Sequence, residues 1–493
     1  SSDPSRLRAG DHHAEKTITC SVHGDDFTAS GPKDALDWLE TSIAEEYEIT
    51  VGPRLGPGPN DAKEARALNR VVRWCADRVE YEADPRQVER LIEECGLGGA
   101  KPMATPSVKP TFTELEASED LPNKLHTAFR GAAARGNYLA TDRIDAQFAC
   151  KEICRWMSRP GAQSWKALKR LCRYFNGNQR LVYAYRQQNV DCVDVYTDTD
   201  WAGCPKTRKS TSGGCVLLGR HAIKHWSATQ SSVALSSAEA EFNGVIRGAG
   251  QGLGYQAMLR DLGVEAPLRV WTDSSAAIGI CSRQGLGKLR HLDTHTLWIQ
   301  QAVRNGRVDL RKIAGEHNPA DLMTKHNHSR EKLQSLVKLH DCHFIEGRAE
   351  SAPALRRGAS NKVTMATAEE ELNEVNAQED QDNPSDTPRM PHRELSNEQL
   401  NTQYPSLVAP PDDDLQDAQD DAADAVYQHG LKIAEGVAAD MAVHGRTRRD
   451  PGVAPRRAAA AAGAAAAPLP SAGAAGASDL HSPAGAADRA TPA

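Results

Sequence analysis

The sequence predicts a mixed α/β fold between residues 190 and 345, with helices packed on a mixed sheet. The first observation is the order of local patterns, which runs β-β-β-α-β-α-α-β-α along this stretch. The second is that the strand patterns are short, alternating and β-branched, as half-buried strands require. The third is a pair of strand patterns in hairpin spacing, joined by the turn Gly219-Arg220-His221.

The elements of this fold can be assigned in chain order. The strand patterns cover residues 192–201, 213–218, 222–227, 268–272 and 308–313. The helical patterns cover residues 238–262, a segment that opens at Asp273, residues 291–303, and a final segment that begins at Asp321. Since helices of this length are interleaved with short strands, we expect flanking helices that cover the sheet.

The two ends of the 493-residue chain differ in composition. Nearly all Trp, Phe, Tyr and Cys residues come before residue 346, whereas polar residues and then Ala, Gly and Pro dominate the remainder. Such a tail cannot bury enough apolar surface to offset its conformational entropy. We therefore expect residues 346–493 to be mostly disordered, with one candidate helix at 420–444. Residues 1–14 are expected to be a disordered start, and a chain that begins at Ser1 is typical of a piece of a longer protein.

Charge and cysteine content limit the environment of the protein. The net charge of -7 is carried by the tail, so it says little about the partner of the folded part. The eleven cysteines form no Cys-x-x-Cys pair and no zinc-binding spacing, and no secretory signal precedes them. We expect free thiols in an intracellular compartment, either cytoplasmic or nuclear. No apolar run approaches the roughly 18 residues of a membrane span, so we expect no membrane partner.

Acidic residues stand in separate short phrases of the segment 190–345: Asp198, Glu241, Asp273 and Asp321. Two of them end strand patterns and two belong to helical patterns. Carboxylates brought from separate elements to one place form the kind of site that hard divalent cations require. Phosphodiester chemistry on nucleic acid is therefore the first hypothesis. The three aspartates also have ordinary alternatives, since Asp198 can be a turn residue, Asp273 a helix N-cap and Asp321 a first-turn carboxylate.

The phrases around these acids resemble those of the ribonuclease H domain of copia-type retrotransposon polyproteins. They are Tyr196-Thr-Asp-Thr-Asp-Trp-Ala-Gly203, Arg208-Lys-Ser-Thr-Ser-Gly-Gly214, Val233-Ala-Leu-Ser-Ser-Ala-Glu-Ala-Glu-Phe242, Asp273-Ser-Ser-Ala-Ala-Ile278, Arg290-His-Leu-Asp293 and Ala320-Asp-Leu-Met-Thr-Lys325. Six phrases in one order are far more specific than any single motif. The resemblance implies a ribonuclease H-like sheet with flanking helices at residues 190–345.

The resemblance also implies roles for the acidic residues. Asp198, Glu241, Asp273 and Asp321 would hold two Mg²⁺ ions, with Mn²⁺ as an alternative, and the substrate would be the RNA strand of an RNA–DNA hybrid. Glu241 is preferred to Glu239 because the Phe-x-x-Val-Ile that begins after it matches the helix expected after the catalytic glutamate. Asp200 is expected to hold the metal-binding residues in place and not to bind a metal ion itself. His317 stands where some enzymes of this fold have a mobile histidine near the metals, and an exposed loop histidine is the alternative.

Residues 15–189 resemble the end of the palm, the thumb and the connection of a reverse transcriptase of the same class, a partial α+β region. A strand pattern ending at His23, the pair Asp25-Asp26 and a returning strand pattern resemble the catalytic hairpin. His23 stands where that family usually has an aromatic residue, and an acidic pair in a turn is more often just a turn. The family places the fingers and a further metal-binding aspartate before this hairpin. We therefore expect an incomplete RNA-directed DNA polymerase that does not extend a primer.

Basic residues in two places are candidates for contact with nucleic acid. A helical pattern at residues 164–175 has an apolar face and a basic face, the latter formed by Lys166, Lys169, Arg170 and Arg173. Arg208 and Lys209 lie in a turn rich in Ser, Thr and Gly. A solvated face and an ordinary loop are the alternatives. The expected partners are an RNA–DNA hybrid, its RNA or DNA strands, and the remainder of the polyprotein, in virus-like particles of the cytoplasm or in the nucleus.

A competing hypothesis is a degenerate or repurposed copy that binds nucleic acid without turnover. The altered residue His23, the incomplete polymerase and the low-complexity tail favour this hypothesis. The four intact carboxylates favour a nuclease, because a decayed copy has no chemical reason to keep all of them.

Overall fold

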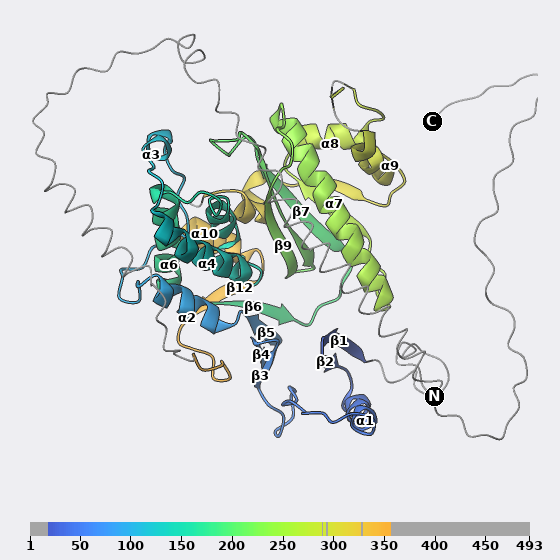
Figure 1. Cartoon of the computed structure of the whole chain (residues 1–493). Helices are drawn as coiled ribbons and strands as arrows, with labels where there is room; N and C mark the ends of the chain where they lie inside the picture. Colours follow the sequence, from blue (N-terminus) through green and yellow to red (C-terminus); the bar gives the residue numbers. More distant parts are fainter. Residues whose placement is uncertain (1–17, 288, 292–293, 327–328, 356–493) are drawn as a thin grey trace, which may run out of the picture. The chain divides into compact units, whose positions relative to one another are not determined.

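The structure is a computed structural model of the whole chain, and it describes residues 18–287, 289–291, 294–326 and 329–355 (Figure 1). The segments expected to be disordered, 1–14 and 346–493, lie outside these residues apart from 346–355. The candidate helix at 420–444 also lies outside them. Within the described part of the chain, no helix is both long enough and apolar enough to cross a membrane.

The first sheet has five strands in the order β11-β10-β7-β8-β9. They are β7 (Val193–Asp200), β8 (Thr211–Leu218), β9 (His221–Thr229), β10 (Leu268–Thr272) and β11 (Asp309–Lys312). Strands β7, β8 and β9 are antiparallel neighbours, whereas β10 runs parallel to both β7 and β11. The sheet is therefore mixed, and the predicted mixed α/β fold is confirmed.

The helices of this region are α7 (Ser237–Asp261), α8 (Ser275–Ser282) and α9 (Trp298–Arg304), preceded by the short 3-10 helix η2 (Thr294–Leu297). Their order along the chain agrees with the prediction. The prediction that a final helix begins at Asp321 is wrong in kind, because Asp321 lies inside the 3-10 helix η4 (Pro319–Met323). This helix ends at Thr324, whose hydroxyl donates a hydrogen bond to the carboxylate of Asp198.

Helix α7 lies along the sheet and approaches β7 very closely (Figure 1). Its residues Gly244, Gly248 and Gly252 are spaced four apart and so form one stripe. A Cβ atom at Gly248 would lie 2.4 Å from Cγ2 of Thr197, and one at Gly252 would lie 2.4 Å from Cδ1 of Leu268. The stripe therefore sets how near the helix comes to β7.

The second sheet has the strand order β12-β6-β5-β4-β3, and all its neighbours are antiparallel. Its strands are β3 (Glu64–Ala67), β4 (Arg70–Trp74), β5 (Arg78–Glu82), β6 (Arg180–Arg186) and β12 (Cys342–Ile345). Helices α2 (Pro85–Glu94), α4 (Asn123–Ala140), α5 (Gln147–Cys154), α6 (Ala162–Gly177) and α10 (Arg330–Lys338) share one apolar core with it. The short helix α3 (Phe112–Glu116) precedes α4 and contributes no buried residue.

Near the end of the described residues, the chain returns to the sheet and core of the N-terminal half. Strand β12 pairs with β6, and Leu333, Leu336 and Val337 of α10 are buried in the core of the N-terminal half. Beyond β12, Arg348 forms an ion pair of 2.6 Å with Glu89. The end of the segment 190–345 thus packs with residues far upstream in the sequence.

The N-terminal hairpin consists of β1 (Thr19–His23) and β2 (Asp26–Ser30), which pair antiparallel and are followed by α1 (Lys33–Ala44). The expected strand, tight turn and returning strand are present, with Gly24 in the left-handed conformation at φ 64°. Nearly every residue of this hairpin is exposed.

Candidate metal centre

Two neighbouring parallel strands bring the first two carboxylates of the site together. Asp198 lies near the end of β7, and Asp273 directly follows β10. Trp271 of β10 is in register with Tyr196 of β7. Since the carboxyl ends of parallel strands meet at one edge of a sheet, Asp198 and Asp273 lie side by side there.

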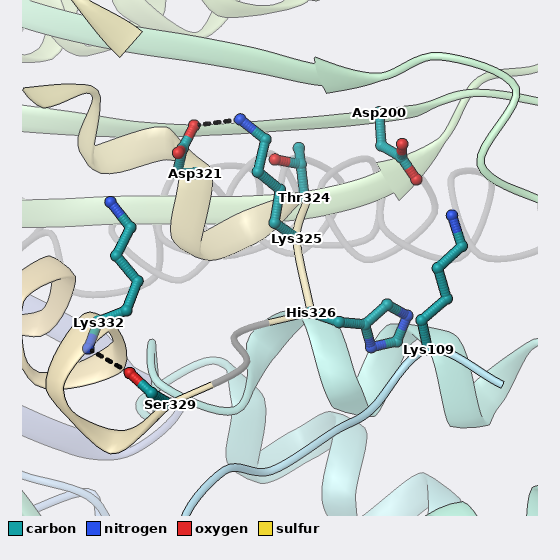
Figure 2. Close-up of a pocket in the computed structure, with 8 residues that line it drawn as sticks. All are labelled: Lys109, Asp200, Asp321, Thr324, Lys325, His326, Ser329 and Lys332. Carbon is teal, nitrogen blue, oxygen red and sulfur yellow. Dashed lines mark hydrogen bonds and ion pairs between the residues drawn. The ribbon is translucent and has the colours of Figure 1, made fainter. Parts of the chain in front are cut away.

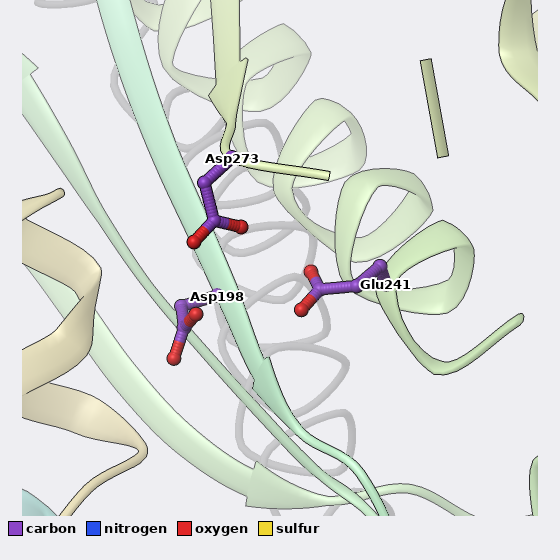
Figure 3. A group of neighbouring side chains, drawn as sticks. All are labelled: Asp198, Glu241 and Asp273. Carbon is purple, nitrogen blue, oxygen red and sulfur yellow. The ribbon is translucent and has the colours of Figure 1, made fainter. Parts of the chain in front are cut away.

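The third carboxylate comes from the first turns of α7. Figure 3 shows Glu241 pointing from this helix towards Asp198 and Asp273. One carboxylate oxygen from each of the three residues lies within 4.8 Å of the others. The close approach of α7 to β7 places Glu241 here, because Gly244, one turn further along, lets the helix rest against Thr199. We call Asp198, Glu241 and Asp273 the carboxylate cluster.

The electrostatics of the cluster show a surplus of negative charge. Burial raises the pKa of Glu241 to about 9, and the charges of Asp198 and Asp273 add to the shift. Burial, followed by repulsion from Asp198, also raises the pKa of Asp273. Atom Oε2 of Glu241 is buried and has no hydrogen-bond partner within the described residues. A divalent cation would lower the pKa values of these acids, because it favours ionised carboxylates. It would also give the buried oxygen of Glu241 a partner.

Asp321 lies beside the cluster and is held by a lysine. The Nζ atom of Lys325 is 2.6 Å from Oδ1 of Asp321 and 3.5 Å from Oδ1 of Asp198. Burial alone lowers the pKa of Lys325, but attraction to Asp198, Asp321 and Asp273 outweighs it and raises the pKa. Asp321 is therefore not among the three converging carboxylates, and Lys325 links it to them. Its assignment as a fourth metal ligand stays a prediction.

Tight packing against β8 holds this segment in place. A Cβ atom at Gly213, which is in register with Asp198, would lie 2.6 Å from the Cβ of Met323. The hydroxyl of Thr324 donates a hydrogen bond to Oδ2 of Asp198. Thr324 and Lys325 were not among the residues selected from the sequence. The one available signal was that Lys325 follows Asp321 by four residues, the spacing of neighbours on one helical face.

The alternative acid Glu239 lies elsewhere. Its carboxylate accepts a hydrogen bond from the backbone N–H of Leu235 and bonds Nε2 of His291 at 2.9 Å. Its backbone N–H bonds Ser236, the N-cap of α7. The structure therefore brings Glu241, and not Glu239, to the carboxylate cluster.

Asp200 lines a cavity of about 330 Å³ next to the cluster (Figure 2). We call it the lysine cavity, because Lys109, Lys325 and Lys332 line it together with Asp200 and Asp321. Burial raises the pKa of Asp200, and Lys109 opposes this shift. Lys109 belongs to the N-terminal half of the chain, and nothing in its local sequence connected it with this site.

The remaining candidates are not among the converging carboxylates, although His317 belongs to a turn whose Gly315 packs against Asp273. His317 has a side chain 73% exposed, and its nearest acidic contact is Glu316 at 3.7 Å. Asp25 and Asp26 lie in the exposed β1–β2 hairpin. Arg208 is exposed in a turn closed by a hydrogen bond from its N–H to the carbonyl of Cys204, and Lys209 continues the same turn. The roles proposed for these residues stay predictions.

The basic residues of α6 lie along a second cavity, of about 250 Å³. Lys166 forms an ion pair of 2.9 Å with Glu114, and Arg173 donates to the carbonyl of Lys101. Arg170 donates to the hydroxyl of Thr105, and Lys169 lines the same cavity. The predicted helix is therefore present, and some of its basic groups already have partners in the chain.

Comparison with known proteins identifies relatives of this chain, although no protein-family model matches it. It is 29% identical over 238 residues to the Retrovirus-related Pol polyprotein from transposon RE2 of Arabidopsis thaliana, which covers 48% of this chain and 16% of that protein. It is 26% identical over 265 residues to the corresponding polyprotein from transposon TNT 1-94 of Nicotiana tabacum, covering 52% and 20%. The chain is a distant homologue of copia-type retrotransposon Pol polyproteins.

A third relative, the Pol polyprotein from transposon RE1 of Arabidopsis thaliana, is 27% identical over 243 residues, or 49% of this chain and 16% of that protein. The matches thus span 16 to 20% of the length of these polyproteins. The resemblance inferred from the six phrases is confirmed at the level of family.

Two solved structures also align with part of the chain. One is an N-terminal RNase H domain from Mycobacterium tuberculosis fused to maltose binding protein, with 15% identity, a TM-score of 0.20, and 30% of this chain and 97% of that chain covered. The other is LC11-RNase H1 in complex with an RNA/DNA hybrid, with 18% identity, a TM-score of 0.19, and coverage of 27% and 92%. With TM-scores this low, the functional conclusion depends on the geometry of the site itself.

Proposed function

We propose that this Pol-related chain carries a ribonuclease H-type endonuclease that hydrolyses the RNA strand of RNA–DNA hybrids. The observation that carries the proposal is the convergence of Asp198, Glu241 and Asp273 from two parallel strands and a helix, with a buried oxygen of Glu241 left without a partner. A structural role for these acids would provide each of them with a cation or donor, as buried charges require.

The donor set suits magnesium, with manganese as the alternative. Carboxylate oxygens are the ligands that these hard cations prefer, and Asp198, Glu241 and Asp273 offer at least one each within a common radius. When bound, such ions would supply an activated water and stabilise the leaving oxygen of a phosphodiester. Asp321 is the candidate for a further ligand, since it lies beside the cluster and its partner Lys325 is half-exposed.

Neighbouring side chains would orient the carboxylates that bind the metal ions. Thr324 and Lys325 fix the carboxylate of Asp198 through a hydrogen bond and an ion pair. The ammonium group of Lys325 also lies where it would attract the phosphate next to the bond being cut. Recognition would then run through backbone charge and the 2′-hydroxyl rather than base sequence.

A cleavage assay tests the proposal. The chain is incubated with a labelled RNA–DNA hybrid in Mg²⁺ and in EDTA, and only the RNA strand should be cut, only with Mg²⁺. Asp273→Asn should lower the rate by at least about a hundredfold, because an amide is a poorer ligand for a hard cation and electrostatic stabilisation is a large catalytic contribution.

Asp309→Asn is the matched control for this assay. Asp309 starts a strand of the same sheet, is half-exposed and forms an ion pair with Arg311. The same substitution there should leave the rate within about twofold, since exposed pairs contribute little. Equal loss in both variants, or cutting without a divalent ion, would contradict the proposal.

A second candidate function has one observation in its favour. Lys325 already contacts Asp198 and Asp321, so two of the four expected ligands have an internal cation. This favours a copy that binds nucleic acid without cleaving it. Hybrid affinity in the absence of any cutting, for the unaltered chain in Mg²⁺ and in Mn²⁺, would select this candidate. Primer extension should be absent in either case, and its presence would overturn the expectation of an incomplete polymerase.

A further inference from the structure

The lysine cavity connects the two halves of the chain beside the carboxylate cluster. Lys109 comes from the segment before α3, whereas Lys325 and Lys332 come from the segment around η4 and α10. Figure 2 shows Lys109 beside Asp200 and His326, and Lys325 bonded to Asp321. Lys109 and Lys332 are exposed. Cations from separate segments that gather next to a proposed phosphodiester-cutting site favour a phosphate ligand.

A second cavity adjoins the first and has a different lining. We call it the mixed cavity, because one part of its wall is basic and another is apolar. The basic part is formed by Lys166, Lys169, Arg170 and Arg173, and the apolar part includes Met103, Val108, Leu115, Ile153 and Trp156. Two acids, Glu114 and Glu152, also line the cavity, and Glu114 pairs with Lys166. A wall of this kind suits a ligand with a flat apolar face and a negative charge, as an unpaired nucleotide has.

His326 lines both cavities, so they share a wall. Its ring is held by residues of the N-terminal half: Nδ1 lies 3.0 Å from the hydroxyl of Ser107, and Phe148 contacts it edge-on at a centroid distance of 4.8 Å. The two cavities are therefore neighbours, and a ligand long enough to extend beyond the lysine cavity would meet the mixed cavity next.

A buried donor in the mixed cavity lacks an acceptor. The Nε atom of Arg170 is buried without a hydrogen-bond partner in the described part of the chain, although its Nη2 atom bonds Thr105. Buried guanidinium N–H groups nearly always have an acceptor. Burial lowers the pKa of Arg170, and repulsion from Arg173 adds to this shift. Both arginines line the cavity, so a phosphate bound there would offset their repulsion.

We infer that the two cavities bind a single-stranded extension of the hybrid that continues beyond the cutting site. The phosphates would follow the lysine cavity, and the first unpaired nucleotide would enter the mixed cavity, with its base against the apolar wall. A cavity of about 250 Å³ is too small for a duplex. The inference rests on the proposed function, because it assumes that the hybrid lies at the carboxylate cluster.

Binding measurements in EDTA test the inference without any cleavage. The whole chain is titrated with a blunt hybrid and with hybrids carrying about eight unpaired nucleotides at the 3′ or the 5′ end of one strand. We expect one of the extensions to tighten binding roughly tenfold, since stacking and phosphate contacts add to the affinity of the duplex. The salt dependence should also become steeper, by about 0.7 per additional phosphate contact.

Charge variants locate the effect. Lys166→Gln and Arg170→Gln should remove most of the gain from the extension while changing the affinity for the blunt hybrid less than twofold. Lys166 is exposed, so its loss cannot unfold the chain, and its result stands even where Arg170→Gln lowers stability. Lys224→Gln, on the exposed side of β9, is the control and should change neither affinity.

The outcomes separate the two proposals. No tightening by any extension, or equal losses for blunt and extended hybrids in the Lys166 variant, overturns the inference. Tightening together with an inability to cut any hybrid in Mg²⁺ would overturn the proposed nuclease and leave the binding path standing.

Discussion

Two buried acidic sites of this chain differ in how their charge is satisfied. In the N-terminal half, Arg143 and Asp145 are almost fully buried and form two parallel hydrogen bonds of 2.9 and 2.7 Å. Arg143 also donates to the carbonyls of Gln179 and Asn178, and the hydroxyl of Tyr174 donates to Asp145. Every charge in this pair has a partner within the protein.

The carboxylate cluster has no such balance. Its three acids face one another, and the nearest cation, Lys325, is half-exposed and shared with Asp321. A buried charge with partners inside the protein needs no ligand, whereas one without them favours a site that a ligand from outside completes. Buried acidic residues therefore support the structure in one half of the molecule and, under our proposal, take part in catalysis in the other.

The largest effect should come from breaking the satisfied pair. Arg143→Met should lower the free energy of unfolding by about 3–5 kcal/mol, because it leaves the Asp145 carboxylate buried without its cation. Urea denaturation followed by tryptophan fluorescence measures this change. Arg159→Met is the control, since the Arg159–Asp120 pair is largely exposed, and it should have no measurable effect. A small effect of Arg143→Met would show that the two sites do not differ as described.

The unsatisfied cluster should make stability depend on pH. The folded-state pKa of Glu241, about 9, lies above its ordinary value of 4.5, so between these values the folded state binds more protons than the unfolded state. In EDTA, stability should therefore fall as pH rises from about 5 to about 9, by at most about 1.4 kcal/mol per pH unit. Glu241→Gln should flatten this slope, and saturating Mg²⁺ should do the same in the unaltered chain. A slope that the substitution does not change would contradict the surplus of charge at Glu241.

The next largest effect on stability should come from a substitution in the close contact between α7 and β7. Gly248→Ala should destabilise the chain by about 1–3 kcal/mol, because the added methyl group collides with Thr197. It should also slow cleavage, since the displaced helix carries Glu241. Gly250→Ala on the exposed face of α7 meets nothing within 4 Å and should stabilise by about 0.5–1 kcal/mol. Thermal unfolding of the two variants separates packing from helix propensity.

Lys325→Met should have the smallest effect on stability, below about 1 kcal/mol, because its ion pairs are half-exposed. It should strengthen Mn²⁺ binding by up to about fivefold, which is the equivalent of that energy, because Asp198 and Asp321 lose a competing cation. Electron paramagnetic resonance of free Mn²⁺ measures this. Lys332→Met, which removes another lysine of the same cavity, is the control, and an equal gain there would exclude a specific role for Lys325.

The local sequence was sufficient to predict the strands and helices of the first sheet, because alternation and helical periodicity are properties of neighbouring residues. The resemblance of Phe-x-x-Val-Ile to the helix expected after the catalytic glutamate also selected Glu241 over Glu239, and Glu241 is the residue that meets Asp198 and Asp273. The sequence failed at the helix expected to begin at Asp321, because this segment packs against Gly213 of another strand.

The sequence by itself determined the order of the elements, the family of the chain and the acids that could meet, because each is encoded in short, contiguous phrases. Only the tertiary structure decided that β12 joins β6, that Lys325 stands between Asp198 and Asp321, and that Lys109 reaches the same cavity. These contacts join segments far apart in the chain. They depend on tertiary packing, which no local pattern records.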